Sequence, residues 1–119
     1  MSTNKDLVTE YFARLSKGDL NGVLDLFADD ASVYEPFSSK NVLHGISEIE
    51  PFVKVAMMAT EGLQREITFS PQKKDKIVAN VKFKRGSDVT GRFTFGIKDL
   101  ADKSGGYKKI KSLKIEFLE

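Results

Sequence analysis

The chain has 119 residues, of which 40% are hydrophobic and 30% are charged, which is ordinary for one globular domain spanning residues 1–119. It contains no cysteine and one histidine, so a disulfide framework, thiolate chemistry and a metal site are not expected. The sequence shows neither a secretory signal pattern nor an apolar run of the roughly 20 residues that span a bilayer. We therefore expect a cytoplasmic protein that needs no cofactor and does not contact a membrane.

Two helices are predicted at the start of the chain. The first is capped by Ser2 or Thr3 and ends at Lys17-Gly18, because glycine readily adopts the left-handed conformation that follows a helix. The second is capped by Asp19 and ends at Asp29-Asp30. Each has the apolar spacing of one buried face, formed by Leu7, Val8, Tyr11, Phe12 and Leu15 in the first and by Leu20, Val23, Leu24 and Phe27 in the second.

A short strand, a loop and a third helix are predicted next. The strand covers residues 31–37, and its alternation puts Glu35 and Phe37 on the same side as Ala31 and Val33. Residues 38–44 form the loop. The third helix begins with a capping box of Ser47 and Glu50, ends at Gly62, and has a buried stripe made of Ile49, Phe52, Val53, Ala56 and Met57.

From residue 63 onward the apolar period changes to two, which predicts strands at 63–70, 76–84, 89–98 and 107–118. Turns are predicted at 85–88 and 99–106. In the last strand Ile110 is out of phase with the later apolar residues, which predicts a β-bulge near Lys111-Ser112. Helices followed by mostly antiparallel strands indicate an α+β fold, with three N-terminal helices covering the apolar face of the sheet.

The order of short motifs also resembles a known superfamily. A helix ending in Gly18-Asp19, then Phe27-Ala28-Asp29-Asp30-Ala31, Val33-Tyr34-Glu35-Pro36 and His44-Gly45 resemble the nuclear transport factor 2-like superfamily, which includes SnoaL-like polyketide cyclases and ketosteroid isomerases. The resemblance implies a cone-shaped, cystatin-like fold, in which helices wrap a curved, mostly antiparallel sheet and a pocket opens between them. Because such folds host many reactions, the resemblance specifies architecture more closely than activity.

The resemblance to ketosteroid isomerases suggests roles for two residues. In those enzymes a tyrosine of the first helix donates a hydrogen bond to the enolate oxygen, and Tyr11 occupies that position. Their general base is an acid that precedes a proline at the end of the first strand, and Glu35 before Pro36 occupies that position. The residues themselves support this reading, because a carboxylate among apolar neighbours is a candidate base for a proton next to a carbonyl. A tyrosine hydroxyl opposite it could stabilise the developing charge.

Several alternatives remain open at these positions. The second oxyanion donor of ketosteroid isomerases is an acid, and the inward positions of the strand at 89–98 hold none, being Val89, Gly91, Phe93, Phe95 and Ile97. Tyr11 and Glu35 also fit a structural hydrogen-bonded pair. His44 is either a second acid–base group, as in SnoaL-like cyclases, or a solvent-facing helix cap. Arg65 faces inward, but epoxide hydrolase-like chemistry would also need a second inward acid, which the pattern does not supply.

The pocket is predicted to bind a small apolar or carbonyl-bearing molecule. Its predicted ligand-binding residues are Phe12, Phe37, His44, Phe52, Met57, Phe93, Phe95 and Phe117. Two functions are consistent with these residues. One is proton-transfer chemistry of the isomerase or cyclase type, with Glu35 as base and Tyr11 as hydrogen-bond donor. The other is a non-catalytic ligand-binding or protein-interaction domain of the same fold.

Charge is uneven along the chain. Residues 1–70 carry 6 basic and 11 acidic side chains, whereas residues 71–119 carry 13 basic and 6 acidic ones. The basic residues alternate along the outer face of the predicted sheet with few aromatic side chains, so a solvated face is expected rather than a nucleic-acid site. In the resembled superfamily this face often forms a homodimer. Several like charges lie on the face here and would repel each other across a close contact, so any homodimer is expected to be polar or offset.

Overall fold

The computed structural model describes residues 4–35, 42–60, 64–70, 75–85, 87–100 and 107–118. The strands form one six-stranded sheet in the order β2-β1-β6-β5-β4-β3, in which β1 and β6 are parallel and all other neighbours are antiparallel. In chain order the elements are α1 (Asn4–Lys17), α2 (Leu20–Leu24), β1 (Phe27–Tyr34), β2 (Val42–His44), α3 (Ile46–Ala59), β3 (Gln64–Phe69), β4 (Lys76–Arg85), β5 (Ser87–Leu100) and β6 (Tyr107–Leu118).

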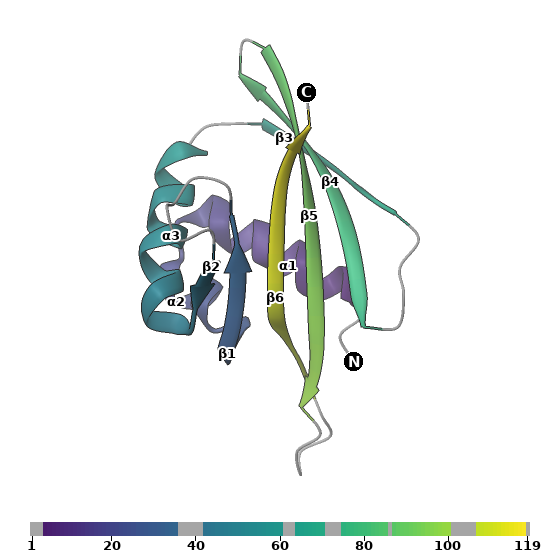
Figure 1. Ribbon diagram of the computed structural model, residues 1–119. Coiled ribbons are helices and arrows are strands. Elements are labelled where there is room, and N and C mark those ends of the chain that lie inside the picture. Colours follow the sequence, from purple (N-terminus) through teal and green to yellow (C-terminus); the bar gives the residue numbers. More distant parts are fainter. Residues whose placement is uncertain are drawn as a thin grey trace.

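The helices lie on one side of this curved sheet (Figure 1). In that view α1 crosses behind the long strands β4, β5 and β6, and α3 stands beside β1 and β2. This is the predicted α+β arrangement of a sheet wrapped by helices, although the sheet has one more strand than the sequence pattern predicts.

The apolar stripe of α1 packs against the sheet, as predicted. Leu7, Val8, Tyr11, Phe12 and Leu15 are all buried. The helix ends where predicted, because Gly18 has a φ of +71° and the N–H groups of Gly18 and Asp19 donate to the carbonyls of Leu15 and Arg14. Asp19 then caps α2, its carboxylate accepting a hydrogen bond from the N–H of Gly22 at 3.0 Å.

The second helix is shorter than predicted. It ends at Leu24, and residues 27–30 belong to β1 instead. Pairing with β6 overrides the helical pattern here, since Phe27 lies opposite Ile110 and the N–H of Ile110 donates to the carbonyl of Leu26 at 2.8 Å. Phe27 pairs with Ile110 and Ser32 pairs with Ser112. The two residues of β1 are thus five positions apart, whereas their partners on β6 are two positions apart. The extra residues of β1 bulge, and Asp29 and Asp30 within this bulge are exposed.

The region after β1 differs from the prediction in two ways. β1 ends at Tyr34 rather than at Phe37, which lies outside the described residues, as do all of residues 36–41. Residues 42–44, predicted as loop, form β2 and pair antiparallel with β1. The predicted alternation is nevertheless present, because Val33 and Glu35 are buried whereas Tyr34 is 45% exposed.

The start of α3 corrects the predicted capping box of Ser47 and Glu50. The helix begins at Ile46, so Ser47 already lies in its first turn, and the N-cap is Gly45 with a φ of +80° and no side-chain hydrogen bond. The carboxylate of Glu48 instead accepts a hydrogen bond from the N–H of His44 at 2.9 Å. The helix ends at Ala59, and the predicted end at Gly62 lies outside the described residues.

β4 and β5 are longer than predicted, whereas β6 has the predicted bounds. Arg85 pairs with Ser87, so most of the predicted 85–88 turn is strand, and β5 continues to Leu100, which pairs with Tyr107. The bulge predicted near Lys111-Ser112 is confirmed. Gly96 pairs with Ser112 and Ile97 pairs with Ile110, so Lys111 is the extra residue on β6, and the shift in phase buries Ile110 completely.

The central strands supply a test of the assigned faces. Leu113 is fully buried and lies between Val33 of β1 and Phe95 of β5 in the ladder. We expect Leu113→Ala to lower the free energy of unfolding by about 2–5 kcal/mol in urea denaturation, because it removes buried methyl groups and leaves a cavity. The matched control is Lys114→Ala on the exposed face of β6, which should change it by less than about 0.5 kcal/mol. Equal losses in the two variants would contradict the assigned faces.

Candidate functional site

A cavity of about 590 Å³ lies between α1, α3 and the helix-covered face of the sheet. This volume is within the roughly 300–1,000 Å³ that small-molecule sites occupy. Among the lining residues that the structure describes, Tyr11, Glu35, Glu48 and Thr60 carry polar groups. The other described lining residues are apolar and comprise Phe12 and Leu15 of α1, Pro51, Phe52, Val55, Ala56 and Ala59 of α3, and Leu43, Phe83, Val89, Phe93, Ile115 and Phe117 of the sheet.

Three large apolar side chains mark where this cavity opens to solvent. Val55, Val89 and Phe117 line the cavity and are also 64%, 42% and 41% exposed. Large apolar side chains that gather at an exposed rim commonly mark a binding site. These three residues give the opening between α3 and the ends of β5 and β6 an apolar rim, which favours entry of an apolar molecule.

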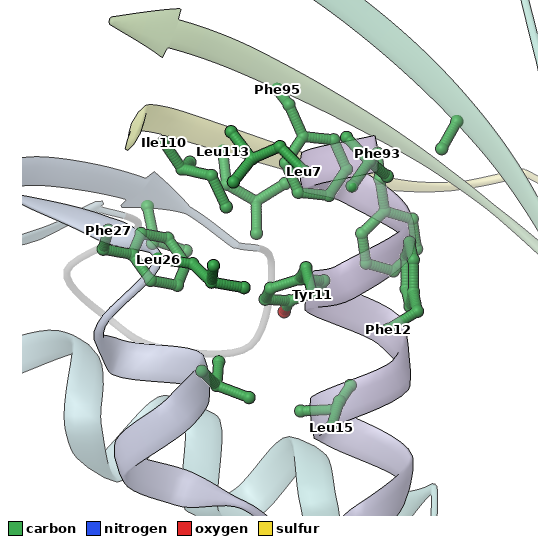
Figure 2. Packing of buried hydrophobic residues seen from close by; sticks show 14 of the residues in the cluster. Leu7, Tyr11, Phe12, Leu15, Leu26, Phe27, Phe93, Phe95, Ile110 and Leu113 are labelled. Atoms are coloured by element: carbon green, nitrogen blue, oxygen red, sulfur yellow. The ribbon is translucent and has the colours of Figure 1, made fainter. Parts of the chain in front are cut away.

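Tyr11 lies where α1 crosses the sheet. Its ring makes edge-to-face contacts with the rings of Phe12, Phe27 and Phe95, at centroid distances of 5.0, 6.0 and 5.5 Å. Figure 2 shows the ring enclosed by these side chains and by Leu26, with its oxygen facing away from Phe95 and Leu113. The Tyr11 side chain is only 1% exposed, so its position is set by packing on several sides.

The hydroxyl of Tyr11 makes no hydrogen bond to any residue in the part of the chain that the structure describes, although Tyr11 lines the cavity. Buried hydroxyl groups are rarely left without a partner. Burial raises the pKa of the Tyr11 phenol well above its usual range, and the nearby positive charge of Arg65 offsets only part of that effect. The group therefore stays protonated and can donate a hydrogen bond to a molecule in the cavity.

Arg65 of β3 contacts the turn of α1 that carries Tyr11. Its guanidinium carbon lies 5.7 Å from the centre of the Phe12 ring, and Nη1 donates to the carbonyl of Phe12 at 3.4 Å. Burial lowers the pKa of Arg65, and the interaction with Tyr11 raises it by less. Arg65 faces the helix-covered side of the sheet, as its parity predicts, but it is not a lining residue of the cavity.

Two carboxylates line the same cavity. Glu35 follows β1 and is 5% exposed, whereas Glu48 lies in the first turn of α3 and is half-buried. Within the described residues, no hydrogen bond joins Glu35 to the Tyr11 hydroxyl, so the two do not form the structural pair considered from the sequence. Tyr11 and Glu35 are both lining residues of the cavity.

The seven predicted ligand-binding residues that the structure describes fall into two groups. Phe12, Phe52, Phe93 and Phe117 line the cavity, whereas Phe95, Met57 and His44 do not. Phe95 is fully buried beneath Tyr11, and Met57 packs partly buried against the core. His44 is exposed on β2, where its Nδ1 lies 2.9 Å from Oγ of Ser32. Phe37 lies outside the described residues.

Glu48 was not predicted as a site residue, because the inward-facing acids were sought by the alternation of residues in strands, which does not apply to the first turn of α3. A signal was nevertheless present. Glu48, Phe52, Val55 and Ala59 are spaced by four, three and four residues, which puts them on one face of a helix. All four line the cavity. Extending the face of Phe52 by one turn toward the N-terminus would have identified this acid.

β5 contributes rings rather than an acid. A Cβ atom at Gly91 would lie 2.9 Å from Cε1 of Phe93, and 3.6 Å from ring atoms of both Phe83 and Phe117. All three of these phenylalanines line the cavity. The three rings therefore occupy the space that a side chain at residue 91 would need. A carboxylate at this position would displace the rings.

No group of three or more histidine, cysteine, aspartate or glutamate side chains that could hold a metal ion occurs among the described residues. Within the same ranges, no helix combines the length and the apolar composition needed to cross a membrane.

Comparison with known families supports the resemblance noted in the sequence. Residues 8–100 match the family model of the SnoaL-like domain. This match confirms the predicted nuclear transport factor 2-like superfamily. No curated protein matches the chain closely enough to count as a relative.

Solved structures share the fold over nearly the whole chain. A protein from Sphaerobacter thermophilus is 21% identical with a TM-score of 0.74, and the match covers 100% of this chain and 99% of that one. A protein from Sinorhizobium meliloti, provisionally named a polyketide cyclase, is 25% identical with a TM-score of 0.69 and coverage of 93% and 94%. SalBIII, an epoxide hydrolase/cyclase-like enzyme in pyran ring formation in the polyether salinomycin, is 18% identical with a TM-score of 0.68 and coverage of 96% and 89%.

The unpaired hydroxyl of Tyr11 leads to a stability prediction. Tyr11→Phe should leave the free energy of unfolding unchanged or raise it by roughly 1 kcal/mol, because no hydrogen bond is lost and a buried polar atom is removed. Urea denaturation of the ligand-free protein measures this. A loss of about 2 kcal/mol or more would show that the hydroxyl has a structural partner and would contradict its assignment to the cavity.

The raised pKa of Tyr11 leads to a second prediction. An unfolded tyrosine loses its proton near pH ~10. The folded protein holds the proton to higher pH, so the stabilisation is complete below about pH 10 and is lost as the pH rises through the folded pKa. The free energy of unfolding should therefore decrease with rising pH above about 10, and less steeply in Tyr11→Phe. Identical slopes for the two proteins in urea denaturation would contradict the burial of an ionisable phenol.

Proposed function

From the match of residues 8–100, by which the chain belongs to the SnoaL-like domain family, we propose that its cavity binds a small, mostly apolar molecule that carries a carbonyl group. In this proposal Glu35 removes a proton from the carbon next to the carbonyl. Tyr11 donates a hydrogen bond to the carbonyl oxygen as negative charge develops on it. The reaction is thus a proton transfer of the isomerase or cyclase type.

The observation that carries this proposal is the Tyr11 hydroxyl, which is buried and lines the cavity without a hydrogen-bond partner among the described residues. A donor held in position in a mostly apolar cavity stabilises developing negative charge more strongly than water does, because it needs no reorientation during the reaction. The rings of Phe27 and Phe95 hold Tyr11 in position before any ligand arrives. A carbonyl oxygen would supply the acceptor that the hydroxyl lacks.

Glu35 is the proposed base because its carboxylate lies on the same cavity wall and is 5% exposed. A base must reach the proton that it removes, and Glu35 lines the cavity that would hold the ligand. Further support for chemistry at a carbonyl comes from the Sinorhizobium meliloti protein provisionally named a polyketide cyclase, which is 25% identical over most of the chain.

A second candidate function is ligand binding without chemistry. The observation that favours it is the composition of β5, whose buried positions Gly91, Phe93, Phe95 and Ile97 include no acid. A single oxyanion donor stabilises an enolate less than two donors do. The cavity would then act as a carrier or a sensor site for the same class of apolar carbonyl compound.

Proton exchange separates these two functions without knowledge of the natural substrate. β-Tetralone is a small apolar ring ketone with acidic hydrogens next to its carbonyl. In heavy water, the protein should accelerate loss of the corresponding proton NMR signals above the buffer rate. Glu35→Gln should abolish the acceleration while binding persists, and Tyr11→Phe should reduce it by about 10²–10³-fold.

Tyr34→Phe is the matched control, because Tyr34 is exposed and does not line the cavity. It should exchange β-tetralone at the wild-type rate. Binding of β-tetralone with exchange no faster than in buffer would overturn the catalytic proposal and leave the binding function. Acceleration that survives in Glu35→Gln would exclude Glu35 as the base.

A further inference from the structure

The exposure of two neighbouring strands changes in step along the cavity. Three pairs of facing positions follow one another on the helix-covered face of β5 and β6, namely Phe95 with Leu113, Phe93 with Ile115, and Gly91 with Phe117. The first pair is fully buried, the side chains of the second are 6% and 7% exposed, and Phe117 of the third is 41% exposed. Because Tyr11 packs on Phe95, the cavity is closed at that end and opens toward Phe117.

The opposite wall of the cavity is α3, which lines it over most of the length of the helix. Its lining residues run from Glu48 in the first turn to Ala59, the last residue of the helix. At roughly 1.5 Å per residue, these two positions are about 16 Å apart along the helix axis. In Figure 1 the last turn of α3 lies at the same end of the sheet as the C-terminal end of β6. The cavity is therefore elongated, and its long dimension runs along α3 toward the exposed rim.

The sheet-side wall of the cavity is a continuous aromatic surface. The ring centroids of Phe12 and Phe93 are 5.4 Å apart, and those of Phe93 and Phe83 are 6.3 Å apart. Atoms of the Phe83 and Phe117 rings both lie 3.6 Å from the position of a Cβ at Gly91, so these rings meet there. The aromatic surface therefore continues from α1 to the exposed Phe117. An apolar ligand group is stabilised in proportion to the surface that it covers along this wall.

We propose that the ligand is elongated, with its carbonyl end at Tyr11 and a hydrocarbon chain that follows β5 and β6 to the rim formed by Val55, Val89 and Phe117. This rests on the proposed function, which places the carbonyl oxygen at the Tyr11 hydroxyl. A compact ligand at the closed end would leave the three rim side chains in water, whereas a chain that reaches the rim buries them. The substrate class is then an alkyl ketone or acyl compound with a chain, of which β-tetralone represents only the carbonyl end.

A series of methyl ketones tests the predicted chain. 2-Hexanone, 2-octanone and 2-decanone share the carbonyl group and differ only in the length of the alkyl chain. Protein NMR titrations give their dissociation constants. Each added methylene should tighten binding about threefold, so 2-decanone should bind roughly 80-fold more tightly than 2-hexanone. A cavity that takes only a compact ligand would give no such gain with chain length.

Val55→Asp is the decisive variant, because it places a charge on the rim, and the exposure of Val55 means that the fold tolerates the change. It should weaken the binding of 2-decanone at least about tenfold and change that of 2-hexanone less than about twofold, since only the longer chain reaches the rim. The matched control is Met58→Asp, one turn further along α3, since Met58 is exposed but does not line the cavity. Met58→Asp should keep the wild-type gain with chain length.

The outcomes separate this inference from the function on which it rests. If β-tetralone binds and the three alkyl ketones bind no more tightly as the chain lengthens, the inference is overturned and ligand binding stands. If the full gain with chain length survives in Val55→Asp, or if Met58→Asp removes it equally, the chain does not lie at the rim and the assignment fails. If neither β-tetralone nor any of the alkyl ketones binds the wild-type protein, the ligand-binding proposal fails together with the inference.

Discussion

Contacts between aromatic rings of α1 and β5 hold the helix across the sheet, and the position of the cavity depends on them. Tyr11 lies 5.5 Å from Phe95 and Phe12 lies 5.4 Å from Phe93, measured between ring centroids. Consecutive residues of a helix point about 100° apart, so these two neighbours diverge. Tyr11 turns toward Phe27 of β1, whereas Phe12 lies beneath Arg65 of β3. The curved sheet and α3 then enclose a space that the helix does not fill.

The same packing explains why a polar atom persists in so apolar a place. Most of the described core consists of aliphatic and aromatic side chains, and the Tyr11 hydroxyl lies among them without a partner in those ranges. A buried polar group that lacks a hydrogen bond destabilises a fold, so a phenylalanine would satisfy packing alone. Functional groups often oppose stability in this way. This is the reason for the proposal that Tyr11 serves a ligand rather than the fold.

Much of the fold could be predicted from periodicity, because buried faces repeat every three to four residues in helices and every two in strands. The α1 stripe, the cap at Asp19 and the bulge at Lys111 followed from such local rules. Phe27 was misassigned because its pairing with Ile110 is a long-range contact that local spacing does not encode. Within the candidate site, parity indicated Glu35 but could not reveal Glu48, whose position depends on how α3 leans over the sheet. Phe95 faces inward as expected, yet α1 covers it.

The central claim is that the Tyr11 hydroxyl, buried in the aromatic cluster, serves a ligand in the cavity rather than the fold. A crystal structure of the protein soaked with β-tetralone tests this most directly. The account predicts the ring of the ketone between Phe12, Phe52 and Phe93, with its carbonyl oxygen within hydrogen-bond distance of Tyr11 Oη. Density for the ketone only on the outer face of the sheet, with the Tyr11 hydroxyl bonded to another part of the chain, would contradict it.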